Sequence, residues 1–302
     1  INTARLAVVD ESISMAHDLV DYYYLPDVLA IGHMYVKAGM VDGGGLSKKR
    51  VLAYGGYPDE PYSGISNGDY FKKAMVRANG VVENFEQGVD KAVFTNLEGK
   101  DLMDPQFLTE EVEHSWYNYP DGTKSLHPSE GITKPNYTGP KTGTKEHWEF
   151  LDETKKYSWI KSPTFQGKAC EVGPLAKYIV VYTKVKQGII KNPTWAEALM
   201  VKQVDTVSSV LGVPAHVWMC STVGRTACRA LDAQVAASLS QYFFDKLVSN
   251  IKGGDTVVAN TEKFDPNTWP KEAKGVGVLD APRGGLGHWC VIKDGKIDNY
   301  QC

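Results

Sequence analysis

Apolar residues recur every three or four positions near the start of the chain, which is the pattern of a helix that buries one face. Asn2 or Thr3 can cap this helix, and Pro26 predicts that it ends or kinks there. A second helical run is expected over residues 29–37, before Gly43-Gly44-Gly45 breaks the pattern. The apolar stripe of the first helix comprises Leu6, Val9, Ile13, Ala16, Val20 and Tyr23.

Two more helices are predicted in the last third of the chain. The first covers residues 193–211, with Thr194 near its start and Gly212 and Pro214 after it. The second covers about residues 215–252, and its small residues allow close helix packing. We expect it to be a long, central and much-buried helix. Its apolar ridge comprises Leu231, Val235, Leu239, Phe243, Leu247 and Ile251.

Between residues 51 and 167 the periodicity weakens, and proline, glycine, asparagine and tyrosine accumulate. Such a long irregular stretch more often wraps a surface or a site than fills a domain. Its aromatic content argues against disorder. We therefore expect an ordered loop region that packs on a partner surface, a hypothesis that Trp116, Tyr119 and Trp148 would test by losing exposed area in a complex.

The clearest local signal is a hairpin near the C-terminus. Asp294-Gly295 separates two strand-like runs, residues 289–293 and 296–302, as in a tight turn. The second run has no terminator before Cys302, so we expect the natural sequence to continue. The predicted fold class is α+β: mostly helical, with a long central buried helix, long ordered loops and a small antiparallel hairpin. The expected division is helical (1–50), irregular and aromatic-rich (51–167), helical (168–275), then site loop and hairpin (276–302).

Composition and charge argue against nucleic-acid binding and against a membrane span. The 302 residues carry a formal net charge of -3, so no basic footprint for nucleic acid is present. The longest apolar stretches fall well short of the roughly 20 residues of a membrane span, and no export signal is expected in the chain itself.

Few residues suggest chemistry by their spacing. The five cysteines have no Cys-x-x-Cys pair, and we expect them to be mostly buried thiols. The histidines are scattered without metal-ligand spacing, and no hydrolase, kinase or dinucleotide motif is present. One segment stands out: Pro282 and several glycines fix a lone Arg283 in a turn before a strand. Its guanidinium can bind anionic or polar ligands, although a solvated arginine in an ordinary turn explains the same residues.

At this segment the chain resembles the large subunit of nickel–iron hydrogenases, particularly the membrane-bound uptake type. The likeness extends over nearly the whole chain. It rests on Gly43-Gly44-Gly45-Leu46, residues 109–117 (TEEVEHSWY), residues 157–161 (YSWIK), residues 171–176 (EVGPLA), Gly224-Arg225-Thr226, residues 241–247 (QYFFDKL), Ala281-Pro282-Arg283-Gly284 and residues 294–297 (DGKI).

The resemblance implies an enzyme that oxidises H2 to protons and electrons, which pass to a small subunit carrying iron–sulfur clusters. It implies a nickel–iron centre with cyanide and carbon monoxide ligands, a magnesium ion, a periplasmic location, and membrane association through partners that include a cytochrome b. In the family, two Cys-x-x-Cys pairs bind the centre. Neither occurs here, so the thiolate ligands lie outside this sequence, and we expect the chain to be the middle of a longer subunit that is inactive alone.

The resemblance also assigns roles to three residues. Pro282 and Arg283 match the family's Pro-Arg pair, which contacts the cyanides, and the arginine overhangs the open coordination position, where it polarises hydrogen and assists proton removal. Cys302 matches the position whose backbone carbonyl binds magnesium. Asp280, Cys170 and Cys290 depart from the residues that relatives commonly have.

Two alternatives remain open on the sequence. The quinone-site subunit of respiratory complex I shares the fold without the cysteine pairs, and it would explain their absence. The second alternative is an inactive scaffold fragment. Bound nickel in the native complex would separate the hydrogenase from the complex I relative.

Overall fold

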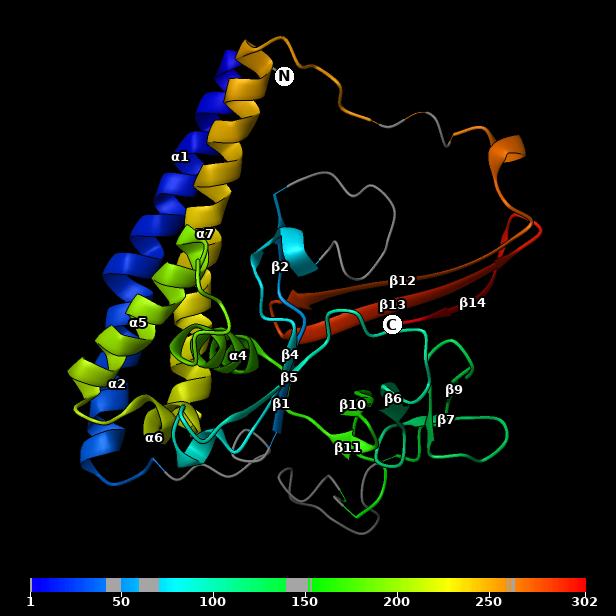
Figure 1. Ribbon diagram of the computed structural model, residues 1–302, viewed down its shortest axis with the longest axis horizontal. Helices are drawn as coiled ribbons and strands as arrows, with labels where there is room; N and C mark the ends of the chain where they lie inside the picture. The colour runs from blue at the N-terminus through cyan, green and yellow to red at the C-terminus, as the bar shows by residue number, and fades with distance from the viewer. Residues whose placement is uncertain are drawn as a thin grey trace.

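The computed structural model describes residues 2–41, 50–59, 71–139, 152, 154–259, 261 and 264–302. Helices gather on one side of the molecule, and small antiparallel sheets make up the rest (Figure 1). The predicted α+β class is therefore confirmed. Gly43-Gly44-Gly45, His147 and Trp148 lie outside the described residues, so the predictions that involve them are not addressed.

The N-terminal helical segment continues past Pro26, so of the two predicted outcomes the ending is wrong, whereas an irregular turn does occur directly before the proline. Helix α1 (Thr3–Leu19) leads through a π-helical turn, η1 (Val20–Tyr24), into α2 (Leu25–Lys37). The wider π turn directly before Pro26 relieves the clash that the proline ring makes with the preceding turn. The predicted stripe is only partly covered: Val20 is buried, whereas α1 itself has no buried residue.

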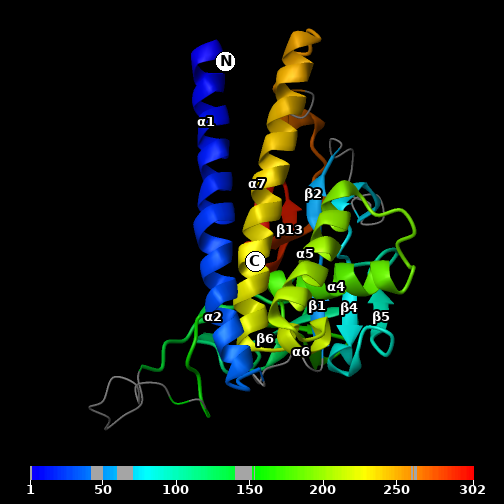
Figure 2. The same ribbon diagram turned by 90° about the vertical axis from the view of Figure 1, so that its left-hand side faces the viewer.

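The predicted helix over residues 215–252 is two helices. Helix α6 (Ala215–Met219) stops at Cys220, and the Ser221 hydroxyl accepts a hydrogen bond from the backbone N–H of Gly224, which caps α7 (Thr222–Lys252). Helix α7 runs beside α1 and α2 (Figure 2) and is buried only as far as Leu239. Among the described helices, the most buried is α4 (Pro174–Lys186). Periodicity did not single it out, because it is buried on nearly all sides and its buried residues include Lys177 and Lys184.

Helix α5 (Trp195–Leu211) confirms the third helix prediction. The Thr194 hydroxyl accepts from the backbone N–H of Glu197, whose carboxylate accepts from the backbone N–H of Thr194, so the two form a capping box. Gly212 ends the helix in the left-handed conformation, with φ 70°.

Residues 51–167 are not one irregular loop but contain short strands, most of them two to four residues long. Such strands are too short to show alternation in the sequence. The first sheet has the order β1 (Arg50–Ala53), β4 (Gly80–Glu83), β5 (Val93–Asn96). Two pairs are β2 (Gly56–Pro58) with β3 (Ala74–Val76), and β7 (Tyr117–Asn118) with β9 (Lys134–Pro135). A four-stranded sheet has the order β11 (Lys168–Ala169), β10 (Ser162–Phe165), β6 (Leu108–Glu111), β8 (Ser125–Leu126).

Strand β1 separates the two hydrophobic cores of the described chain. Val51 and Ala53 join the core that includes helices α4, α5 and α7. Leu52 and Tyr54 face the other core, together with Trp289. Burial on both faces explains why this strand shows no apolar–polar alternation. It also couples the helical side of the molecule to the C-terminal sheet.

The C-terminal sheet contains β12 (Glu272–Ala281), β13 (Gly284–Lys293) and β14 (Lys296–Gln301). The predicted hairpin is confirmed: Asp294 and Gly295 both have positive φ, 48° and 71°, as a tight turn between twisted strands requires. Strand β12 was missed, and the predicted boundary at residue 275 falls within it. Two short 3-10 turns, η3 (Phe85–Gln87) and η5 (Pro266–Thr268), complete the described elements.

Cysteine burial follows the expectation for three of the five thiols. Cys170, Cys220 and Cys228 are buried, Cys290 is half-buried and Cys302 is exposed; all are free. Among the helices of the described residues, none combines the length and the apolar character that crossing a membrane needs.

Candidate functional site

Pro282 and Arg283 are the two turn residues between β12 and β13. The strand ladder runs without interruption up to the pair Ala281–Gly284, so only these two residues lie outside it. Both are exposed, and within the described part of the chain the Arg283 guanidinium has no hydrogen-bonding or charged partner. The predicted turn before a strand is confirmed, and the exposed guanidinium also matches the alternative of a solvated arginine.

Close backbone packing holds the strand after this turn. Gly284 has φ 138°, and a Cβ atom there would lie 2.7 Å from the backbone nitrogen of Gly173. Gly173 is the N-cap of α4, with φ 140°. Only glycine permits this approach, so the glycines of two separate motifs place the turn against the start of α4.

A third motif reaches the same place through an ion pair. Arg225 of α7 donates from Nε to Oε1 of Glu171 (2.7 Å) and from Nη2 to Oε2 (3.0 Å). The backbone of Glu171 bonds to both Arg50 and Leu52 of β1. Arg229, one turn further along α7, donates from Nη1 to the carbonyl oxygen of Pro282 at 2.8 Å. Three segments therefore meet around this turn. Together they are here called the turn junction: residues 171–174, 225–229 and 280–284.

Asp280 fixes the other strand at this junction. Its buried carboxylate accepts from the backbone N–H of Tyr54 (3.1 Å) and of Gly55 (2.7 Å). Burial raises the pKa of Asp280 to about 6, although the positive charge of Lys177 and the two N–H donors act in the opposite direction. Lys177 itself pairs with Asp232 at 2.6 Å, so several buried charges lie beside the turn junction.

Arg283 and Cys302 line the same cavity, of about 440 Å³. Its wall also includes Glu110 and Lys161, whose side chains form a 2.8 Å ion pair. Lys161 also donates to Oε1 of Gln301 at 3.2 Å, and Nε2 of Gln301 donates to the carbonyl of Gly131 at 2.9 Å. Burial raises the pKa of Glu110, and the Lys161 charge counters this effect. The resemblance assigns Arg283 to the nickel–iron centre and Cys302 to magnesium. The fold places both residues on the wall of one cavity.

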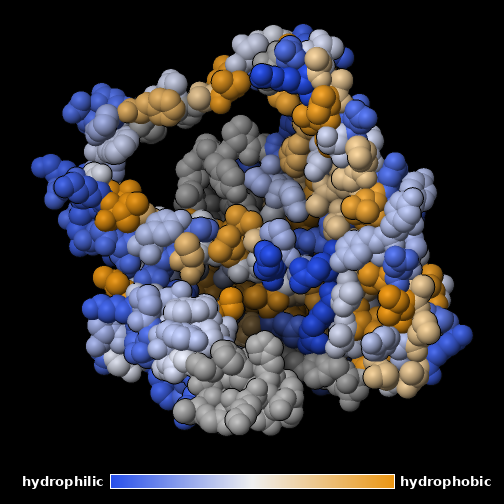
Figure 3. Space-filling model, turned by 180° about the vertical axis from the view of Figure 1, so that it is seen from behind, coloured by the Kyte–Doolittle hydropathy of each residue, from blue (hydrophilic) through white to orange (hydrophobic). Residues whose placement is uncertain are grey.

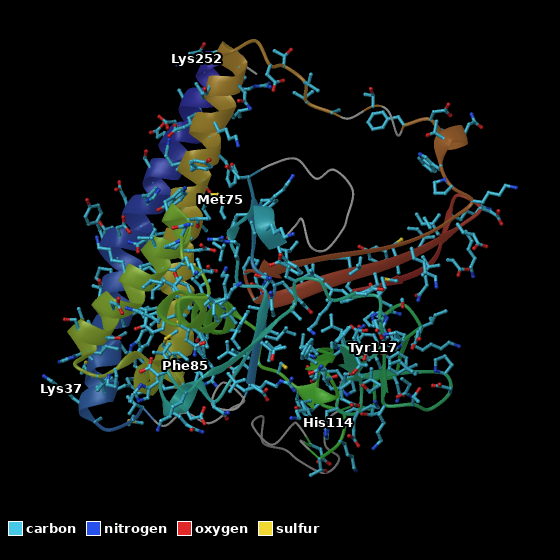
Figure 4. All side chains as sticks on the ribbon, viewed as in Figure 1. Lys37, Met75, Phe85, His114, Tyr117 and Lys252 are labelled. Carbon is cyan, nitrogen blue, oxygen red and sulfur yellow. The ribbon has the colours of Figure 1, made fainter. Side chains whose placement is uncertain are left out.

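Sequence reasoning assigned no role to Glu110 and Lys161, although both lie in motifs that it quoted. Their common signal was the pair of runs at residues 109–117 and 157–161, which the isolated bridge between Ser115 and Ser158 places side by side, next to the pairing of β6 with β10. Those runs lie among the strands, far from the helical side, as Tyr117 and His114 show in Figure 4.

The aromatic residues of this region pack mainly on one another. The Trp116 ring lies 4.9 Å from the Tyr137 ring and 5.3 Å from the Trp159 ring. Trp116 and Tyr119 are already buried, so they have little area left to lose to a partner. Tyr137 and Trp159 remain exposed, and they would report on a partner instead.

The residues of this chain do not fit the nickel–iron centre as ligands. Cys170 belongs to one hydrophobic core, and Cys220 and Cys228 belong to the other. Within the described ranges, no three histidine, cysteine, aspartate or glutamate side chains are placed to hold a metal ion. They do fit as a surrounding wall, with an exposed guanidinium at a cavity.

Comparison with known proteins decides the family. The model of the family described as nickel-dependent hydrogenase matches residues 1–302. The chain belongs to this family. It is 45% identical over its full length to the uptake hydrogenase large subunit of Rhizobium leguminosarum bv. viciae and 43% identical to the hydrogenase-1 large chain of Escherichia coli K12. It covers 46% of each, so the chain spans about half the length of these curated relatives.

Solved hydrogenases share the fold. All of this nickel-dependent hydrogenase chain aligns with half of the [NiFeSe]-hydrogenase chain from Dm. baculatum, with a TM-score of 0.64 and 25% identity. A Ni-Fe-Se hydrogenase from D. vulgaris Hildenborough gives a TM-score of 0.65 over the same shares of both chains, at 24% identity. The predicted family is therefore confirmed, and the roles of Pro282, Arg283 and Cys302 stay predictions.

Proposed function

We propose that this chain is part of the large subunit of a nickel–iron hydrogenase that oxidises H2 to protons and electrons. The observation that supports the proposal best is the turn junction: three motifs far apart in the sequence meet there and present Arg283 to a cavity. The names of the relatives, an uptake hydrogenase large subunit and a hydrogenase-1 large chain, favour the same activity.

Arg283 and Pro282 supply the wall over the reacting site. The positively charged guanidinium can polarise H2 at the cavity. Pro282 has no backbone N–H, so this turn residue adds no donor of its own beside the guanidinium. The nickel–iron centre with its cyanide and carbon monoxide ligands, held by thiolates outside this chain, supplies the redox chemistry when bound.

We assign the backbone carbonyl of Cys302 to a magnesium ion. Magnesium prefers oxygen ligands, and the cavity wall at Cys302 also carries the carboxylate of Glu110. The 2.8 Å bond from Lys161 holds that carboxylate in place. No role is assigned to the Cys302 thiol.

The electron acceptor in this proposal is a small subunit with iron–sulfur clusters, and the complex is periplasmic and attached to the membrane through a cytochrome b. Apolar patches on the helical side of the molecule (Figure 3) support an assembly that covers surface there. Exposed apolar side chains on α1 and α2 include Met15, Leu19, Ile31 and Met34.

The complex I relative is not favoured. Every relative named above is a hydrogenase, and the family model is that of nickel-dependent hydrogenases. The inactive scaffold describes only what we expect of these residues tested alone, because their thiols do not fit the metal centre.

The test is H2-dependent dye reduction by the native complex carrying Arg283→Lys. We expect the rate to fall by about 10²-fold with nickel content unchanged, since lysine keeps the charge but loses the planar set of donors. Arg5→Lys, at an exposed arginine at the start of α1, is the matched control and should keep the full rate. An unchanged rate for the Arg283 variant would remove this residue from the mechanism.

A further inference from the structure

We infer that Arg229 and Asp280 are positioning residues for Arg283, because each fixes one side of the two-residue turn that carries the guanidinium. The inference rests on the proposed function in one respect, that Arg283 acts at the cavity. Arg229 carries no signal in the sequence: it lies on the exposed side of α7, three residues after the Gly224-Arg225-Thr226 motif.

The bond from Arg229 fixes the peptide group next to Arg283. The proline ring locks φ of Pro282, so the orientation of the Pro282–Arg283 peptide depends on ψ of Pro282 alone. Arg229 Nη1 donates to the carbonyl oxygen of that peptide at 2.8 Å. A rotation about ψ would break this bond, which therefore selects the direction in which the Arg283 side chain leaves the backbone.

Asp280 fixes the strand that enters the turn. Its two carboxylate oxygens accept from Tyr54 and Gly55, and its own backbone N–H donates to the carbonyl of Gly55 at 2.9 Å. The partner backbone is itself constrained: Gly55 has φ 75°, and a Cβ there would lie 2.2 Å from the carbonyl oxygen of Val76. Three hydrogen bonds to a fixed segment hold the end of β12 in place.

The strand that leaves the turn is held separately, by the contact between Gly284 and Gly173. With both strand ends fixed, the turn peptide is the remaining freedom, and Arg229 removes it. If Arg229 served only the surface of α7, it would not need to donate to the carbonyl oxygen of Pro282. Positioning predicts that losing Arg229 changes the turn and the turnover number together while the fold and the metal content persist.

The experiment uses Arg229→Met in the native complex, which keeps an unbranched apolar side chain and removes the donors. Asp280→Asn is the second variant, and it loses one acceptor for the Tyr54 and Gly55 N–H groups. Lys246→Met is the matched control, because Lys246 lies on the same helix and bonds to Asp59 at 2.8 Å, away from the turn. The readouts are amide hydrogen exchange over residues 281–286, H2-dependent dye reduction, KM for H2 and nickel content.

For Arg229→Met we expect severalfold faster exchange at residues 283–285 and a severalfold lower turnover number, with KM and nickel content as in the wild type. Asp280→Asn should show the same two changes, with faster exchange at Tyr54 and Gly55 as well. If Arg229→Met matches Lys246→Met in exchange and turnover, the inference is wrong. Should Arg283→Lys prove fully active, the proposed function fails instead, and the exchange data still decide whether these residues fix the turn.

Discussion

Two polar junctions inside the chain are built in different ways. The turn junction joins Arg225 to Glu171 and holds Pro282 and Asp280, and it borders the cavity at Arg283. The second, here called the lysine junction, joins Arg77, Asn79, Lys184, Thr194 and Glu197. There Lys184 donates to the Arg77 carbonyl (2.7 Å) and to Oδ1 of Asn79 (2.8 Å), while Arg77 Nε donates to the fully buried Glu197 at 2.9 Å.

The two junctions differ in whether a charged group remains without a described partner. In the lysine junction each of these charged groups is satisfied by a neighbour, so the arrangement stabilises the contact of α4 and α5 with the strands. In the turn junction the paired groups immobilise the backbone, and one guanidinium is left without a described partner at a cavity. Buried charge is therefore common to both junctions. What distinguishes the turn junction is a fixed backbone that presents one charged group to a cavity.

The largest effect is expected for Gly284→Ala. The added Cβ would lie 2.7 Å from the Gly173 backbone nitrogen, in a conformation that side chains rarely adopt. We expect a loss of about 3–4 kcal/mol in the free energy of unfolding, measured by urea denaturation. Gly295→Ala, also at positive φ but with nothing within 4 Å, should lose only about 1 kcal/mol. Equal losses would show that close packing does not hold the turn junction.

The next effect concerns the lysine junction. Glu197→Gln keeps the side-chain shape but leaves Arg77 without its charged partner, and it weakens the capping box of α5. We expect a loss of about 3 kcal/mol in the free energy of unfolding, with the Arg283 turn unchanged. Amide exchange over residues 281–286 checks the second part. Faster exchange there would mean that the two junctions are coupled and that they cannot be treated as independent parts of the structure.

A smaller effect depends on pH. Burial lowers the pKa of Lys184 to about 8, with the charges of Glu197 and Arg77 acting in opposite directions. Between about pH 8 and the ordinary lysine value of 10.5, the unfolded state binds more protons than the folded state, so this group makes the protein more stable as pH rises.

Comparing wild type with Lys184→Met isolates this contribution, because the other groups titrate in both proteins. The wild type should gain up to ~2–3 kcal/mol relative to the variant between pH 8 and pH 10.5 in urea denaturation. A difference that does not change with pH would show that Lys184 keeps an ordinary pKa and that its junction is better solvated than its burial suggests.

The sequence predicted the elements whose cause is local. Helix α5 has its capping residues in the chain itself, and the hairpin at Asp294-Gly295 follows from turn geometry. The split between α6 and α7 was missed. The long apolar ridge predicts one continuous helix, whereas the Ser221 hydroxyl caps α7 by accepting from the backbone N–H of Gly224. Strand β1 was missed because both its faces are buried, which removes the alternation that marks a strand.

The candidate site was likewise predicted only where its cause is local in the sequence. Arg283 stands out because a proline and glycines surround it in the sequence. Arg229 and Lys161 do not, since each gains its role from a partner more than 50 residues away. Asp280 was noticed only as a departure from relatives, and its bonds to Tyr54 and Gly55 span more than 220 positions. Long-range contacts of this kind leave no spacing signal in a single sequence.

The ladder between β12 and β13 stays in register over ten residue pairs and stops at the two turn residues. We therefore expect that exchanging either turn side chain shifts no strand and exposes no core. Natural variation or laboratory engineering can explore new chemistry at positions 282 and 283 while the scaffold that carries them stays as it is.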